Sequence, residues 1–318
     1  MKPHTTRAYN NFHIHDEICK ITKVSETSRL QDEIGYYCAI KKTHFSHFFP
    51  RFFNYNNKQA PYELELEYYD YDDLGLQMTE ERTVTAPTFG KYWNSIAEKL
   101  VRILHTFRTD TDPSLAATRL KDEMYVVKTL HYQEELVNSF DFFAELNKKR
   151  EIKLNGEIIL NFDYIWHDVA KLISKTLMHD TPLSLIHGDM CFSNILCSRR
   201  KNIMKFVDPR GSFGAQGVYG DPKYDIAKLL HSFEGGYEYI INDKFNLKVG
   251  DEIVFDFANN NLEIIQDVFK DYPLFLDLDA KLIEGLIFVG MCSRHYDSLE
   301  RQIVMYLTGL KILNKLIS

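Results

Sequence analysis

The stretch that decides the fold is Leu185-Ile-His-Gly-Asp-Met-Cys-Phe-Ser-Asn-Ile-Leu196, which Phe206-Val-Asp-Pro-Arg-Gly211 follows after a short interval. A short apolar run ends in turn residues, so we expect Asp189 in a loop, with Asn194 five positions later and Asp208 after the next apolar strand. Phosphoryl transfer needs a carboxylate near the acceptor hydroxyl and hard oxygen ligands for Mg²⁺. We therefore predict Asp189 as the catalytic base, and Asn194 and Asp208 as the ligands of Mg²⁺.

These loops carry a family resemblance. His187-Gly-Asp189, Asn194 and Asp208 resemble the catalytic and metal-binding loops of the aminoglycoside phosphotransferase and choline kinase superfamily, small-molecule relatives of the protein kinases. Protein kinases have Arg in place of Gly188 and usually Asp-Phe-Gly in place of 208–210, so the small-molecule branch fits better. The resemblance implies ATP as phosphoryl donor with Mg²⁺, a catalytic loop at 187–194 and a metal loop at 208–211.

A second segment supports the first. Gly220-Asp-Pro-Lys-Tyr-Asp-Ile-Ala-Lys-Leu229 is similar to the Asp-Pro-x-x-Asp-Leu-Ala segment of the same superfamily. The resemblance implies that Asp225 begins a helix and accepts hydrogen bonds from the backbone of the catalytic loop, which fixes Asp189 in place. It also implies a supporting role for His187. Neither residue would perform chemistry.

The metal loop also looks like phosphotransferase-type domains associated with bacterial surface-polysaccharide assembly, over about forty residues that include 208–211 and 219–225. This resemblance favours a sugar or a sugar-linked polyol as acceptor. It further implies association or fusion with a nucleotidyltransferase-type partner. The alternative acceptor classes are choline and aminoglycosides.

The pattern of the chain changes near residue 85. Before it, short β-rich runs at 12–15 and 18–22 precede a capped helical segment at 28–40, whereas amphipathic helical spacing dominates afterwards. We predict an α+β, protein-kinase-like fold of two lobes. Residues 1–85 form a small β-rich nucleotide-binding lobe with a hinge near 66–72, and residues 86–318 form a larger, mostly α-helical lobe that holds both loops and the acceptor pocket.

Nucleotide contacts are expected in the small lobe. In the kinase fold a strand lysine contacts the phosphates and a helix glutamate holds it, and Lys20 with Glu33 is the best match, with Lys23 as the competitor. The resemblance places Glu67, Tyr68 and Tyr69 in the hinge, where backbone groups usually bind adenine. No Gly precedes residue 35, so the glycine-rich loop of protein kinases is absent. That absence keeps open a catalytically silent nucleotide-binding or scaffold protein.

The acceptor pocket of such folds lies between the catalytic loop and the C-terminal helices, and a few polar groups fix the ligand there. The candidates are Arg210, His231, Arg294 and His295. If both arginines face the cleft, a phosphorylated or carboxylated acceptor is favoured, because a guanidinium matches such groups bidentately. Acidic walls would instead suit choline or an amino sugar.

Composition agrees with a soluble enzyme. The chain has 318 residues, 45% hydrophobic and 26% charged, which is enough for one large domain or two lobes. Its five cysteines form no Cys-x-x-Cys pair, and no apolar run approaches a membrane span or a secretory signal, which predicts a reducing, cytoplasmic setting without membrane partners. The formal net charge of −7 disfavours a general nucleic-acid binder. Transfer to a protein, or transfer of a nucleotidyl group, remains an alternative reaction.

Overall fold

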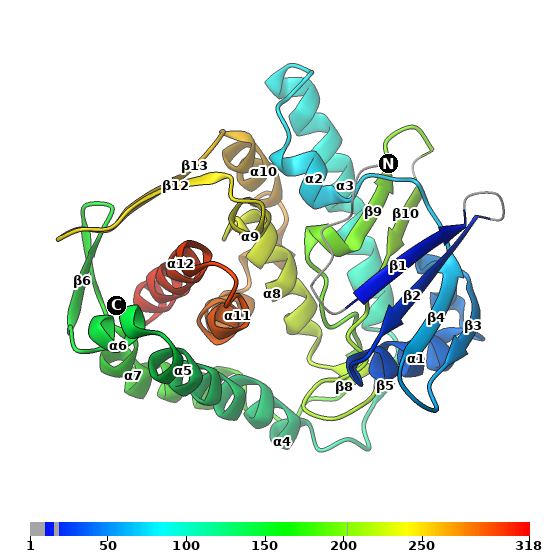
Figure 1. Ribbon diagram of the computed structural model, residues 1–318, viewed down its shortest axis with the longest axis horizontal. Coiled ribbons are helices and arrows are strands. Elements are labelled where there is room, and N and C mark those ends of the chain that lie inside the picture. Colours follow the sequence, from blue (N-terminus) through cyan, green and yellow to red (C-terminus); the bar gives the residue numbers. More distant parts are fainter. Residues whose placement is uncertain (1–9, 16–18, 202) are drawn as a thin grey trace.

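The computed structural model describes residues 10–15, 19–201 and 203–318, and it contains a small sheet region beside a larger helical region (Figure 1). The small region holds one antiparallel sheet of strand order β1-β2-β4-β3. Its elements are β1 (Asn10–His15), β2 (Lys20–Ser25), α1 (Arg29–Ile40), the 3-10 helix η2 (His44–Phe48), β3 (Phe52–Asn56) and β4 (Tyr62–Glu67).

Helix α1 packs on the sheet through a stripe of buried residues. Leu30 and Ile34 lie one turn apart on that stripe and belong to the same buried cluster as Leu64 and Leu66 of β4. This spacing is typical of a helix that buries one face. The predicted helix at 28–40 is therefore found as α1, although the side chain of Ser28 makes no capping hydrogen bond.

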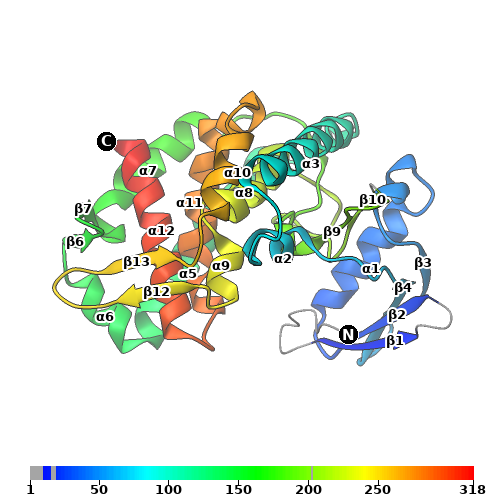
Figure 2. The same cartoon turned by 90° about the horizontal axis from the view of Figure 1, so that it is seen from above.

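The larger region begins with the connection after β4 and is mostly helical (Figure 2). Its helices are α2 (Leu74–Thr79), α3 (Ala86–Phe107), α4 (Ala117–Asp122), the π-helix η3 (Glu123–Val127), α5 (Lys128–Ser139), α6 (Asp141–Asn147), α7 (Phe162–Thr176), η4 (Phe192–Asn194), α8 (Pro222–Phe233), α9 (Tyr237–Ile241), α10 (Asn261–Phe269), η5 (Pro273–Leu276), α11 (Leu278–Met291), η6 (Cys292–Arg294) and α12 (Leu299–Ile317). Its short strands are β5 (Thr111–Asp112), β6 (Glu151–Leu154), β7 (Glu157–Leu160), β8 (Leu183–Leu185), β9 (Ile195–Ser198), β10 (Ile203–Phe206), β11 (Tyr219–Gly220), β12 (Phe245–Lys248) and β13 (Val254–Phe257). None of the described helices is both long and apolar enough to cross a membrane.

Two small sheets carry the loops with the sequence motifs. β8 is the central strand of the order β11-β8-β5, and the catalytic loop leaves its C-terminal end. β9 and β10 form an antiparallel hairpin that follows the catalytic loop and precedes the metal loop. The backbone N–H of Val207 donates to the carbonyl of Asn194 at 3.0 Å, so this hairpin holds the two loops side by side.

Helix α8 lies deep in the helical region. Every residue from 224 to 233 is buried, and the helix packs against α11 and α3. A helix that is buried all round has neighbours on every side. Helix α8 is thus among the least exposed of the described elements.

Several local features differ from the sequence-based expectation. The helical spacing expected after residue 85 is interrupted once, where α4 is followed by one π-helical turn at 123–127 before α5 continues to Ser139. The hairpin β6–β7 was not predicted. It turns at Asn155-Gly156, which have φ of 47° and 82°, the positive values that a tight hairpin turn requires.

Candidate active site

The backbone of the catalytic loop is held by Asp225. Its Oδ2 accepts a hydrogen bond from the N–H of His187 at 2.7 Å, and its Oδ1 accepts one from the N–H of Gly188 at 2.8 Å. These two bonds are the ones that the sequence resemblance implied for Asp225. The helix itself is capped by Asp221, whose side chain accepts from the N–H of Lys223, so Asp225 lies in the first turn rather than at the cap.

His187 connects the catalytic loop to the metal loop. Its buried ring bonds the carbonyl of Val207 through Nε2 at 3.0 Å, and its Nδ1 accepts the N–H of Asp189 at 3.2 Å. Because Nδ1 accepts, the proton resides on Nε2. Burial lowers the pKa of His187 to about 4, which keeps the ring neutral. This geometry suits the supporting role predicted for His187.

The carboxylate of Asp189 pairs with a lysine that sequence reasoning missed. Lys228 Nζ lies 2.9 Å from Asp189 Oδ1, and the lysine side chain is almost fully buried. Burial lowers the pKa of Lys228, but Asp189 together with Cys191, Tyr224 and Tyr237 outweighs burial, and the pKa of Lys228 is raised. The spacing in the sequence could have indicated Lys228, because it lies three residues after Asp225 and hence on the same face of α8.

Asn194 and Asp208 can provide oxygen ligands for a divalent cation. Asn194 Nδ2 donates to the backbone carbonyl of Asp189 at 2.8 Å, so Oδ1 is the atom of Asn194 that can bind a metal. Asp208 follows β10 in a left-handed conformation with φ of 58°, and its side chain is about half exposed. An amide oxygen and a carboxylate fit Mg²⁺, which usually takes few protein ligands together with phosphate and water. Among the described residues no cluster of three or more His, Cys, Asp and Glu competes for a metal.

The prediction that Lys20 pairs with Glu33 is wrong, because the lysine that pairs with Glu33 is Lys23. Lys23 Nζ lies 2.6 Å from Glu33 Oε2 and also contacts Asp208 Oδ1, whereas Lys20 pairs with Glu65 on the neighbouring strand. The reason is the twofold alternation of a strand: residues three apart point to opposite faces, and only the face of Lys23 lies against α1. Asp208 and Glu33 raise the pKa of Lys23 against the effect of burial, so the lysine stays charged.

The predicted hinge residues follow the last strand of the sheet. Glu67 ends β4, and its Oε2 accepts a hydrogen bond from the hydroxyl of Tyr69 at 2.8 Å. The backbone N–H of Tyr68 donates to the carbonyl of Cys19 at 2.8 Å. That N–H is thus engaged within the protein, and an adenine contact in this segment remains a prediction.

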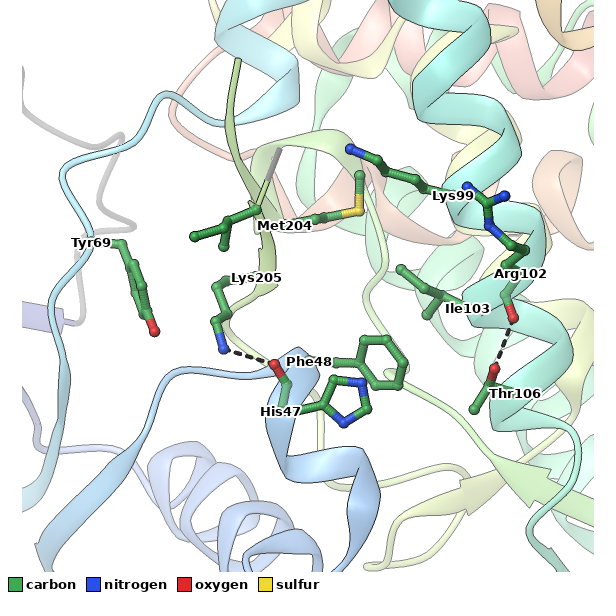
Figure 3. A pocket seen from close by; sticks show the side chains of 10 residues that line it. His47, Phe48, Tyr69, Lys99, Arg102, Ile103, Thr106, Met204 and Lys205 are labelled. Carbon is green, nitrogen blue, oxygen red and sulfur yellow. Dashed lines mark hydrogen bonds between the residues drawn. The ribbon is translucent and has the colours of Figure 1, made fainter. Parts of the chain in front are cut away.

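One cavity borders the hinge and not the catalytic loop (Figure 3). It has a volume of about 560 Å³, and its lining includes Tyr69, Lys99, Arg102 and Lys205. Lys205 Nζ crosses it to donate to the carbonyl of His47 at 2.7 Å. Neither the predicted base nor the predicted metal ligands line this cavity, so its size alone does not mark the chemistry.

The four predicted acceptor residues fall into two groups. His231 is fully buried among Tyr237, Phe288 and Met291, so it belongs to the core and its assignment as an acceptor contact is wrong. A histidine near the end of a helix looks the same in sequence whether it faces the core or a pocket.

The other three lie nearer to the catalytic loop or at the surface. Arg210 lies in the metal loop. Its N–H donates to the carbonyl of His187 at 2.9 Å, and its guanidinium lies 3.5 Å from the hydroxyl of Tyr224. Arg294 Nη2 donates to the hydroxyl of Tyr132 at 2.9 Å. The ring of His295 lies edge-on to a neighbouring tyrosine.

Comparison with known proteins places the fold. No family model and no curated protein sequence matches this chain. Among solved structures, it is similar to a thermostable mutant of aminoglycoside phosphotransferase APH(4)-Ia in its apo form, with a TM-score of 0.50 and 8% sequence identity over 94% of this chain and 86% of that chain. Another crystal structure of APH(4)-Ia gives a TM-score of 0.49 and 8% identity over 97% of this chain and 88% of that chain. The likeness confirms the predicted α+β, kinase-like fold with a small sheet region and a larger helical region.

Proposed function

We propose that this protein is a kinase that transfers the γ-phosphoryl group of ATP to a hydroxyl of a small metabolite. The observation that carries the proposal is the pair of hydrogen bonds from the loop backbone to Asp225, at 2.7 and 2.8 Å. A rigid buried helix thereby holds the loop that bears Asp189, and reacting groups need such fixed placement. The same loop reaches the metal loop through His187.

In this proposal each residue has one task. Asp189 accepts the proton of the acceptor hydroxyl while that oxygen bonds to the γ-phosphorus. Lys23, held by Glu33, contacts the nucleotide phosphates. Asn194 Oδ1 and Asp208 hold Mg²⁺, which supplies neutralisation of phosphate charge when bound.

The leading class of acceptor in this proposal is a sugar or a sugar-linked polyol. That class rests on the resemblance of the metal loop to domains of surface-polysaccharide assembly, which remains a prediction, as does the cytoplasmic setting. Fold alone does not choose among acceptor classes.

The test uses the full chain with labelled ATP, Mg²⁺ and a screen of sugars, amino alcohols and aminoglycosides. Mass spectrometry of the product distinguishes addition of phosphate from addition of AMP. Asp189→Asn should lower turnover by about 10² to 10⁴ because a general base is lost with little change in volume. Asp168→Asn is the matched control, since Asp168 pairs with Lys171 on an exposed helix surface.

Two outcomes would count against the proposal. Unchanged turnover in Asp189→Asn would remove Asp189 from the chemistry. Stabilisation by nucleotide with no phosphorylated product from any acceptor would favour the silent nucleotide-binding protein instead.

A further inference from the structure

Lys228 pairs with Asp189, and Lys128 and Arg294 both lie against the ring of Tyr132. We propose that the acceptor carries an anionic group, a carboxylate or a phosphate, in addition to its hydroxyl, and that Lys128, Arg210 and Arg294 bind this group. The inference rests on the proposed kinase function and narrows its substrate class. It predicts a hydroxy acid or a phosphorylated polyol rather than a neutral sugar or an amino sugar.

A chain of contacts connects the predicted base to Arg294. Asp189 pairs with Lys228, and Lys228 Nζ lies 5.5 Å from the centre of the Tyr237 ring. The ring of His295 lies 6.1 Å from that of Tyr237, and Arg294 precedes His295 in the chain. Arg294 is thus brought to the same part of the molecule as Asp189 by contacts among C-terminal elements.

Lys128 and Arg294 share one aromatic ring. The guanidinium carbon of Arg294 lies 4.7 Å from the centre of the Tyr132 ring, and Lys128 Nζ lies 5.9 Å from the same centre. Two cations on one ring repel each other, and the ring compensates only part of that repulsion. An anion between them would compensate the rest.

Lys128 also lies within the electrostatic reach of the catalytic loop. Burial lowers the pKa of Lys128 well below its ordinary value, and Arg210 and Lys228 lower it further, while Asp189 opposes them. Charges act on one another in this way only over a distance comparable to the screening length in salt solution. Arg210, Lys228 and Asp189 therefore lie within electrostatic reach of Lys128.

The usual explanation for such residues is a set of surface ion pairs, but two of these cations are not so paired. Within the described ranges, neither Lys128 nor Arg210 belongs to an ion pair with an acidic side chain. The carboxylate whose field reaches Arg210 is Asp32 of α1, which is not in ion-pair contact with it.

The backbone at Lys128 is also unusual. Lys128 is the first residue of α5 and directly follows the π-helical turn at 123–127. Single π-helical turns inside α-helices occur often at functional sites, because the extra residue re-aims the side chains that follow. The turn is independent of the charges and points to the same residue.

The transfer step is balanced with such an acceptor. The hydroxyl oxygen forms a bond to the γ-phosphorus, the bond from that phosphorus to the oxygen bridging to the β-phosphate breaks with its electron pair leaving on ADP, and the hydroxyl proton goes to Asp189. The anionic group of the acceptor takes no part in bond changes. Its role is to bind and orient the hydroxyl.

The first experiment measures binding of inorganic phosphate to the full chain by calorimetry in the absence of nucleotide. Lys128→Met and Arg294→Gln, made separately, should each weaken binding by about tenfold to a hundredfold, as the loss of one charge-assisted contact does. Lys311→Gln, which removes a cation paired with Glu157 elsewhere, should leave affinity unchanged. Arg294 is exposed, so its variant should fold even if Lys128→Met does not.

A competition measurement locates the bound anion. Saturation with a non-hydrolysable ATP analogue should leave phosphate affinity unchanged if the anion lies beside Asp189. Loss of phosphate binding in the presence of the analogue would place phosphate in the nucleotide site and overturn the proposal, and so would the absence of any phosphate binding.

The second experiment compares acceptor classes with labelled ATP. Hydroxy acids and sugar phosphates should be phosphorylated with a kcat/KM at least tenfold above that of neutral sugars and aminoglycosides, and Arg294→Gln should remove this preference. Equal or better use of neutral or cationic acceptors would overturn the anionic acceptor while leaving the kinase function intact. Failure of the kinase function would appear separately, as the absence of phosphorylated product from every acceptor tested.

Discussion

Replacing Lys23 by Met should destabilise the protein far more than replacing Lys20 by Met. Lys23 Nζ lies 2.6 Å from Glu33 Oε2, and both side chains are less than a tenth exposed. Removing one partner of a buried pair costs about 3 to 5 kcal/mol because the other charge stays buried. We take the lower end, about 3 kcal/mol, because the second partner of Lys23, Asp208, is 47% exposed and its interaction is screened.

The matched variant is Lys20→Met, which removes the same type of ion pair at a more exposed position. Lys20 and Glu65 have side chains that are 30% and 25% exposed, so Lys20→Met should cost at most about 1 kcal/mol. Unfolding in guanidinium chloride, followed by circular dichroism, measures both free energies. Phosphotransfer from labelled ATP should fall strongly in Lys23→Met and stay near the wild-type rate in Lys20→Met. Equal losses in the two variants, or a larger loss in Lys20→Met, would refute the assignment of Lys23.

Three further predictions concern single positions. Gly211→Ala should destabilise the protein by several kcal/mol more than Gly156→Ala. Both glycines have positive φ, but only at Gly211 of the two would a Cβ meet a backbone oxygen, that of Asp32, at 2.1 Å. Equal unfolding midpoints of the two variants would contradict this. Asp225→Asn should lower stability by about 2 kcal/mol and reduce turnover, because an NH₂ group would face one of the two loop N–H groups; an unchanged melting temperature and rate would show that the loop does not depend on them. Burial, with a nearby carboxylate adding to it, raises the pKa of Glu284 well above its ordinary value, so the contribution of Glu284 to stability is present below about pH 4.5 and is lost as pH rises toward the raised pKa. Glu284→Gln should therefore gain stability over the wild type between about pH 5 and about pH 8, and parallel stability curves for the two proteins would argue against it.

The sequence was most informative where function depends on neighbours in the chain. His187, Asp189 and Asn194 lie within eight residues, so their loop is set by local turn chemistry, and Asp225 was found because its motif has a fixed internal spacing. Which lysine of β2 meets Glu33 depends on the face that α1 covers, and that is decided by packing between elements.

Other features depend on contacts that no local pattern encodes. Lys228 reaches Asp189 only because α8 passes under the catalytic loop, and the same three-residue spacing on another helix would mean nothing. His231 has the same neighbours in sequence whether it faces a pocket or the core. The π-helical turn before Lys128 cannot be distinguished from ordinary α-helix in the sequence. Its extra residue shifts the helical spacing of apolar residues by less than that spacing normally varies.

Helix α8 contacts the catalytic loop through three residues: Asp225 at the backbone, Lys228 at the carboxylate of Asp189, and Ser232, which accepts a hydrogen bond from the N–H of Phe192. A rotation of α8 about its axis would therefore move the loop backbone and the carboxylate of Asp189 together. Their mutual geometry would be preserved, but both would shift relative to Asp208 in the metal loop. Core residues that pack against α8 far from the loop, such as Phe269 against Phe233, can thus influence how the phosphoryl donor and the acceptor are aligned. Laboratory selection for new acceptors should accordingly leave the interior around α8 untouched and accumulate changes at the rim.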